Sequence, residues 1–273
     1  MISYNVLEIE GLKEVLETIG TACNYLEIDF FLVGAVARNI WYANSNLELR
    51  GTKDIDFGVY VPDVKTYEQL KLFLIENHQY IQANENAFCL LTPDGKGIDL
   101  MPFGDIAQDG EVMIEGSGMT TLKLDGFEEA FKDGSIVTLI EDKTYKACSI
   151  PGIVVLKLIA YDNRPDRRIK DIIDITNICA HYPDIESNMI WEEHSDLYED
   201  NISHHQIGLI VLGRMMKEII KSNVNLKTRI IQILDNAIEG KSDILEHMIR
   251  DRMTETLDEM AELLVLIKRG ITL

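Results

Sequence analysis

The sequence predicts an α+β fold: a mixed sheet flanked by helices in residues 1–150, followed by a helical bundle in residues 151–273. In the first part, short apolar runs bounded by glycine or proline alternate with helical patterns, as in a sheet covered by helices. In the second part, the apolar residues recur at helical spacing, which is typical of a bundle. A chain of 273 residues is long enough to bury a substantial core.

The elements of the first part follow from periodicity and turn residues. Helical spacing of apolar residues predicts helices over 10–26, 34–43 and 67–77. Short apolar runs predict strands at 28–33, 54–61, 80–83, 87–92, 98–103, 119–124, 135–140 and 145–150. The Pro93-Asp94-Gly95 turn between two of these runs predicts a hairpin.

In the second part, Pro151 is well placed to begin a helix that ends near Asn163, and a second helix begins near Asp171. Residues 183–200 hold seven acids and no Lys or Arg, which indicates a connection between parts. Three further helical patterns cover 203–222, 224–239 and 242–269.

Charge and composition narrow the classes of function. The formal net charge is -20, and residues 1–150 carry 11 Lys and Arg against 25 Asp and Glu. Repulsion of polyanions disfavours a broad nucleic-acid surface. No apolar run reaches about 18 residues and no secretory signal pattern opens the chain, so we expect no membrane span or export. The four cysteines form no C-x-x-C pair, which predicts reduced thiols in a cytoplasmic protein.

Two carboxylates open the predicted strand at 54–61. Alternation along a strand places Asp54 and Asp56 on one face and the apolar Ile55 and Phe57 on the other. Side-by-side carboxylates repel each other, and a hard cation such as Mg²⁺ relieves the repulsion while keeping substrate phosphates as further ligands. The alternative is a pair of turn-forming or solvated acids.

Two further positions extend this candidate site. Asp99 lies in an apolar strand where a buried carboxylate needs a partner, so it is a candidate third metal ligand, or else an acid at a strand end facing water. Gly34 follows the strand at 28–33 and precedes a helix, and such a junction offers free N–H groups to a phosphate. The alternative for Gly34 is a simple turn.

A basic cluster follows residue 151. Lys157 is the only charge inside its apolar helix, and the next loop contains Arg164 and Arg168. Residues 151–171 carry five cations against three anions. The cluster either neutralises Asp171 and Asp174 as part of the structure or holds a triphosphate, and the sequence leaves both open.

Taken together, these residues resemble the polymerase-beta-type nucleotidyltransferase superfamily, in which a glycine turn after a strand is followed by an Asp-x-Asp strand and then by a third Asp on a neighbouring strand. The stretch from Arg50 to Phe57, and the later block from Lys157 to Asp174, are similar to the AbiEii toxin family and its minimal nucleotidyltransferase relatives. The resemblance covers about residues 28–180. It implies a nucleotidyltransferase-like sheet in 1–150 and a helical domain in 151–273 that completes the nucleotide site.

The resemblance also implies a reaction, in which a nucleoside monophosphate passes from an NTP to an acceptor hydroxyl. Mg²⁺ or Mn²⁺ would be bound by Asp54, Asp56 and Asp99, and Asp99 could instead act as the base. The other residues that it implies for nucleotide binding are Gly34, Ala35, Arg38, Thr52, Lys53, Lys157, Arg164, Arg168 and Asp174.

The family usually has Gly-Gly or Gly-Ser where this chain has Gly34-Ala35, so the alternative is a catalytically weak or inactive nucleotide-binding module of a toxin–antitoxin or regulatory system. Asp54-x-Asp56-x-Gly58 also resembles the nucleophile motif of haloacid-dehalogenase-type phosphatases, but the residues before it are polar rather than apolar. The acceptor could be a small molecule, a tRNA or a protein. The resemblance further suggests a cognate antitoxin as partner.

Overall fold

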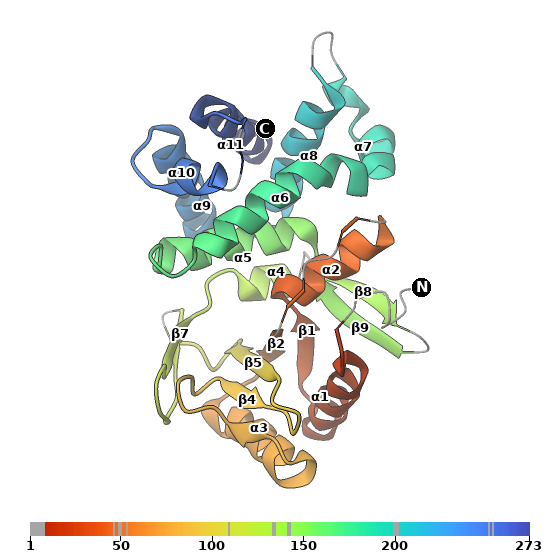
Figure 1. The fold of residues 1–273 in the computed structure, drawn as a ribbon, viewed down its shortest axis with the longest axis vertical. Helices are drawn as coiled ribbons and strands as arrows, with labels where there is room; N and C mark the ends of the chain where they lie inside the picture. The colour runs from red at the N-terminus through yellow and green to blue at the C-terminus, as the bar shows by residue number, and fades with distance from the viewer. Residues whose placement is uncertain are drawn as a thin grey trace. The chain divides into compact units, whose positions relative to one another are not determined.

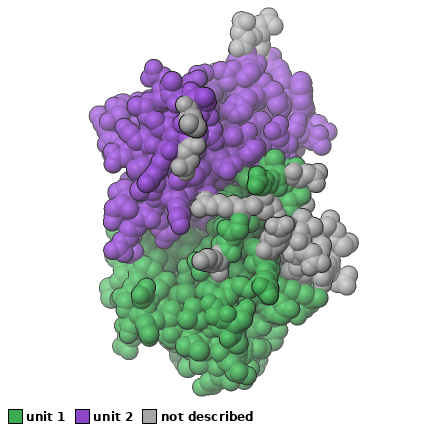
Figure 2. All heavy atoms as spheres, in the orientation of Figure 1, with its two compact units in different colours: residues 1–131, 135–149 green, residues 132–134, 150–273 purple. Residues whose placement is uncertain are grey.

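A computed structural model of the protein describes residues 9–45, 47–48, 51–52, 54–108, 110–132, 135–140, 143–198, 202–250, 252 and 254–273 (Figure 1). The chain forms two compact units, coloured separately in Figure 2. Unit 1 comprises Met1–Phe131 and Ser135–Ser149, and unit 2 comprises Lys132–Gly134 and Ile150–Leu273.

Unit 1 is built on a mixed sheet. Within the described residues, seven strands form it in the order β3-β4-β5-β2-β1-β9-β8. Their bounds are β1 Asp29–Leu32, β2 Asp54–Tyr60, β3 Ile81–Gln82, β4 Cys89–Leu91, β5 Gly97–Phe103, β8 Ser135–Ile140 and β9 Lys143–Cys148. Strand β2 is central, antiparallel to β1 and parallel to β5. The predicted hairpin is confirmed, because β4 and β5 pair antiparallel across the Pro93-Asp94-Gly95 turn.

Three helices of unit 1 accompany this sheet: α1 (Leu12–Leu26), α2 (Gly34–Asn44) and α3 (Val64–His78). Helices α1 and α3 contact each other, and α2 contacts β2 and β9 (Figure 1). Helix α3 begins three residues before the predicted start at Tyr67, because the Asp63 side chain caps it by accepting from the N–H of Thr66 at 2.7 Å. This cap was not recognised in the sequence.

A separate two-stranded sheet follows β5 in the sequence. Strands β6 (Glu111–Met113) and β7 (Thr121–Lys123) form a separate antiparallel pair, and the short helix α4 (Phe127–Lys132) follows. The predicted strand at 119–124 is confirmed as β7. Strand β6 and helix α4 were not predicted, because their lengths of three and six residues give little periodicity.

Unit 2 is helical, as predicted. Its α-helices are α5 Ile150–Asn163, α6 Ile169–Ile185, α7 Ser187–Glu193, α8 His204–Ile220, α9 Val224–Ile238, α10 Ile244–Met248 and α11 Leu257–Thr272. Helices α8 and α11 touch through glycines. A Cβ on Gly213 would lie 2.9 Å from the Cα of Gly270 and would overlap the carbonyl of Ile267, and a Cβ on Gly270 would overlap the carbonyl of Ile210. The two backbones therefore approach more closely than any larger residue allows.

Two segments of unit 2 have more structure than the sequence indicated. The acidic stretch 183–200, which we expected to connect two parts, is helical over much of its described portion, since α6 continues through Pro183 to Ile185 and α7 and a 3₁₀ turn at Ser195–Leu197 follow. Pro183 is buried and its ring faces Gly208 of α8, so tertiary packing favours this proline within a helix. The helix predicted over 242–269 is instead divided into α10 and α11, because Thr256 and Glu259 form a capping box that starts a new helix. No described helix is long and apolar enough to cross a membrane.

Candidate active site

The predicted carboxylates come together on two neighbouring parallel strands. In the pairing of β2 with β5, Asp56 stands opposite Asp99, and Asp54 stands opposite Gly97. Paired strands lie about 4.8 Å apart. The sequence prediction that a third Asp lies on a strand beside the Asp-x-Asp strand is therefore confirmed by the register. Asp54 is exposed, whereas Asp56 and Asp99 are half-buried.

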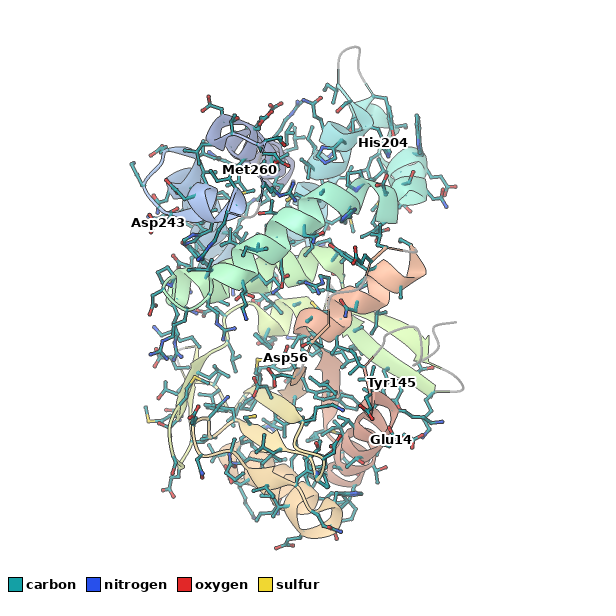
Figure 3. All side chains as sticks on the ribbon, viewed as in Figure 1. Glu14, Asp56, Tyr145, His204, Asp243 and Met260 are labelled. Carbon is teal, nitrogen blue, oxygen red and sulfur yellow. The ribbon has the colours of Figure 1, made fainter. Side chains whose placement is uncertain are left out.

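Gly34 brings the start of α2 against Asp56, which Figure 3 labels. Gly34 has φ 62°, and a Cβ at this position would overlap Oδ2 of Asp56. The backbone just before Gly34 is held to β2, because the N–H of Val33 donates to the carbonyl of Asp56 at 3.0 Å. The positive end of a helix dipole thus lies beside a carboxylate, which is an electrostatically favourable arrangement. Glycine is required here by both its backbone conformation and its lack of a side chain.

A second glycine leaves room for Asp54. A Cβ on Gly97 would overlap Oδ1 of Asp54, so the carboxylate lies over the backbone of β5. The hydroxyl of Thr52 donates to the carbonyl of Asp54 at 2.9 Å, which fixes the backbone where the chain enters β2. The Thr52 hydroxyl therefore holds the backbone at the start of β2.

The residues present fit a hard divalent cation. All the side chains offered are carboxylates, and the two glycines keep the space around Asp54 and Asp56 clear of Cβ atoms. Among the residues that the structure describes, no three His, Cys, Asp or Glu side chains form a ready-made metal cluster. Mg²⁺ commonly takes one or two carboxylates and completes its shell with substrate phosphates and water, so a preassembled set of three is not needed.

Asp99 has two neighbours that the sequence did not reveal. The side-chain amide of Asn86 donates to Oδ1 of Asp99 at 3.3 Å. Cys89 stands opposite Asp99 in the pairing of β4 with β5. Burial, and then the charge of Asp99, raise the pKa of the Cys89 thiol to about 12, so the thiol stays protonated at neutral pH. The sequence signal was a polar segment, 84–86, between two strands, which reads only as a turn.

The predicted phosphate-binding residues of unit 1 differ in accessibility. Ala35 is half-buried in the first turn of α2, next to Gly34. Arg38 is only 2% exposed; its Nη2 donates to Oδ1 of Asn39 at 3.0 Å, and its guanidinium lies 5.6 Å from the ring centroid of Tyr42. Lys53 lies outside the described residues. The structure thus leaves Ala35 partly exposed next to Gly34 and buries Arg38 against Asn39 and Tyr42.

The predicted residues of unit 2 form an ion-pair cluster of their own. The ammonium of Lys157 lies 2.6 Å from Asp171 and 2.9 Å from Asp174, and all three side chains are largely buried. Burial acts to lower the pKa of Lys157, but the two carboxylates outweigh it and raise the pKa above the usual value. The interpretation in which the cluster neutralises Asp171 and Asp174 therefore explains why a lysine stands in the apolar helix α5. Arg168 approaches Asp171 at 3.7 Å and stays 46% exposed, and Arg164 follows the end of α5.

Comparison with solved structures gives distant similarities. A solution structure of the antibiotic-resistance factor ANT(2'')-Ia matches at 13% identity and a TM-score of 0.38, covering 88% of this chain and 97% of that one. A crystal structure of ANT(2'')-Ia in complex with adenylyl-2''-tobramycin matches at 14% identity and a TM-score of 0.39, covering 64% and 88%. An antigenic nucleotidyltransferase-like protein from Paracoccidioides brasiliensis matches at 18% identity and a TM-score of 0.40, covering 81% and 92%. Comparison with curated proteins gives no match.

The family comparison covers most of the chain. The family described as "Nucleotidyl transferase AbiEii toxin, Type IV TA system" matches residues 20–263. The match spans the glycine turn, the Asp-x-Asp strand and the third Asp, and it continues through most of unit 2. The chain therefore belongs to the AbiEii nucleotidyltransferase family.

Proposed function

We propose that this nucleotidyltransferase is metal-dependent and moves a nucleoside monophosphate from an NTP to a hydroxyl of an acceptor. The acceptor oxygen forms a bond to the α-phosphorus, the bond from that phosphorus to the β-phosphate bridge breaks, and pyrophosphate leaves. The hydroxyl proton passes to a carboxylate or to water. Such chemistry depends mostly on positioning and charge neutralisation.

Asp54, Asp56 and Asp99 carry the proposal. Asp54 and Asp56 would hold Mg²⁺ or Mn²⁺, and Asp99 would share in holding the metal or accept the hydroxyl proton. A bound divalent ion supplies positive charge for the triphosphate and lowers the pKa of the acceptor hydroxyl. The first N–H groups of α2, at Gly34 and Ala35, would donate to phosphate oxygens, because a helix start carries unsatisfied donors.

The observation that supports this function best is the contact between Gly34 and Asp56. One close approach places the start of a helix, which suits phosphate, beside a carboxylate that suits the metal of a metal–triphosphate complex. The register that puts Asp99 opposite Asp56 adds a second carboxylate on rigid sheet backbone.

Calorimetric titration tests the site. Each of the four NTPs is titrated with Mg²⁺ into the wild type and into the Asp54→Asn/Asp56→Asn variant, and each titration is repeated with EDTA in place of Mg²⁺. We expect one or more NTPs to bind the wild type only when Mg²⁺ is present and to lose binding in the variant. Equal binding by the variant would show that these carboxylates do not hold the metal–nucleotide complex.

A second candidate is a nucleotide-binding module with little or no turnover. Two observations favour it: Ala35 stands where the family usually has glycine or serine, and Arg38 is buried against Asn39 and Tyr42. Incubation with α-³²P-labelled NTPs and a cell extract separates the two, because transfer labels an acceptor whereas binding alone does not. An Ala35→Ser variant that gains labelling over the wild type would support the weak-module interpretation.

We further propose a cytoplasmic location and a cognate antitoxin as functional partner, in line with the toxin–antitoxin system that the family description names. Growth arrest on expression, relieved by co-expression of a neighbouring gene product, would test the antitoxin. The acceptor would be a small molecule, a tRNA or a protein, and the net charge of -20 disfavours a broad nucleic-acid surface.

A further inference from the structure

The side-chain amide of Asn86 has a defined orientation beside Asp99. Its nitrogen donates to Oδ1 of Asp99 at 3.3 Å, and its oxygen accepts from the N–H of Phe88 at 3.0 Å. A backbone N–H needs an acceptor, so this second bond fixes which end of the amide faces Phe88. The other end, with its two donors, must then face the carboxylate.

The loop that carries Asn86 is held firmly. The side-chain nitrogen of Gln82 lies 2.9–3.3 Å from four carbonyl oxygens, those of Ala83, Asn86, Ala87 and Cys89. The N–H of Cys89 donates to the carbonyl of Asn86 at 3.1 Å, and the N–H of Ala87 donates to the carbonyl of Met119 at 3.0 Å. Because the loop folds around one amide group, the Asn86 side chain projects from a fixed backbone.

We propose that Asn86 is a positioning residue for Asp99, and this rests on the proposed function of the three carboxylates. Asp99 stands opposite Asp56, so two like charges face each other on adjacent strands. A donor on Oδ1 of Asp99 offsets part of that repulsion and limits rotation of the carboxylate. Partners of metal-binding carboxylates typically change metal affinity 10–100-fold when they are removed.

Two roles of Asn86 can be separated by substitution. The turn at 86–88 needs only an acceptor for the N–H of Phe88, which a serine hydroxyl or a carboxylate also provides. Asp99 needs a donor within reach. Asn86→Ser keeps the acceptor for the turn while shortening the side chain, so it removes the contact with Asp99. The same substitution at Asn223, which caps α9 by accepting from Leu226 at 3.0 Å, is the matched control in unit 2.

The first measurement is Mn²⁺ affinity, read from the electron paramagnetic resonance signal of free Mn²⁺ without nucleotide. We expect the wild type to bind Mn²⁺, Asn86→Ser to bind it roughly 10–100-fold more weakly, and Asn223→Ser to match the wild type. Wild-type affinity in Asn86→Ser would overturn the positioning role while leaving the proposed function intact. No binding of Mn²⁺ by the wild type, or undiminished binding by Asp54→Asn/Asp56→Asn, would overturn metal binding by these carboxylates in the absence of nucleotide, and the positioning role with it, whereas the NTP titrations with Mg²⁺ test the proposed function separately.

The second measurement is thermal unfolding of metal-free Asn86→Asp, Asp99→Asn and the double variant. Asn86→Asp keeps the acceptor for Phe88 but sets a carboxylate against Asp99, so we expect its Tm to fall by several degrees. The double variant exchanges amide and carboxylate and restores the hydrogen bond, so we expect it to regain at least half of the loss. If the Tm of the double variant is no higher than the sum of the two single-variant changes predicts, the contact between Asn86 and Asp99 is refuted.

Discussion

Gly34→Ala is the substitution that tests the geometry of the candidate site most directly. At φ 62°, a residue with a Cβ costs about 1–2 kcal/mol relative to glycine. The new methyl would also overlap Oδ2 of Asp56, and forcing an extra carbon into a filled space costs roughly a further 1–3 kcal/mol. We therefore expect the free energy of unfolding of unit 1 to fall by about 2–5 kcal/mol.

Gly95→Ala is the matched control, because Gly95 in the hairpin turn has φ 84° and a Cβ added there would meet nothing within 4 Å. It should lose only the backbone contribution of about 1–2 kcal/mol. Urea unfolding followed by the near-ultraviolet signal compares the two variants. Gly34→Ala should also lose Mg²⁺-dependent NTP binding, since relief of the overlap displaces Asp56, whereas Gly95→Ala should keep it.

The overlap can be isolated by removing the carboxylate. In an Asp56→Ala background, Gly34→Ala should cost no more than Gly95→Ala does in the wild type, because the oxygen that the methyl meets is gone. Equal losses for Gly34→Ala and Gly95→Ala in the wild-type background would refute the reasoning, since the start of α2 would then not press on Asp56.

Three further substitutions address unit 2. Lys157→Met should cost about 3–5 kcal/mol at pH 7, because Asp171 and Asp174 lose their buried cation, and chemical denaturation of the variant and the wild type measures the deficit. In the wild type the raised pKa of Lys157 means that its stabilisation is complete below the unfolded pKa and is lost only as pH rises through the folded pKa, so calorimetry from pH 7 to 9 should show no loss from this group. Gly213→Ala should cost roughly 1–3 kcal/mol, since its methyl meets a backbone carbonyl of α11 that cannot rotate away, and an unchanged Tm would contradict the close approach. Thr256→Ala should cost about 1 kcal/mol by removing the capping box of α11, and amide hydrogen exchange should quicken at residues 257–260 while α8 stays protected.

The grouping of the acidic side chains was partly predictable from sequence because some of its determinants are local. Alternation in 54–57 sets which side chains share a face of the strand. The Asp-Gly turn at 94–95 joins β4 to β5, the strand that carries Asp99. The parallel pairing that puts Asp99 opposite Asp56 is not local. The family resemblance predicted only that the third Asp lies on a neighbouring strand, because a sequence pattern alone does not state how strands pair, and the parallel register is a finding of the structure.

The features that sequence reasoning missed depend on contacts between distant segments. Asn86 looks like a turn residue until β5 brings Asp99 within 3.3 Å of its amide. Pro183 reads as a helix breaker until its ring meets Gly208 of α8. Lys157 could equally have been aimed at a phosphate or at carboxylates, and its neighbours fourteen and seventeen residues later decide what it binds in this structure. Short elements such as β6 escaped because three residues carry no measurable period.

The glycine contact between α8 and α11 has a consequence for how unit 2 can move. Sliding one helix along the other by a turn would bring Leu209 or Lys217 to the place of Gly213, and neither side chain fits where a single methyl already meets a backbone carbonyl. The pair therefore has one permitted axial position. Any rearrangement of unit 2 should therefore keep these two helices packed together as one rigid pair. It should take place at the loops that join the pair to the rest of the unit.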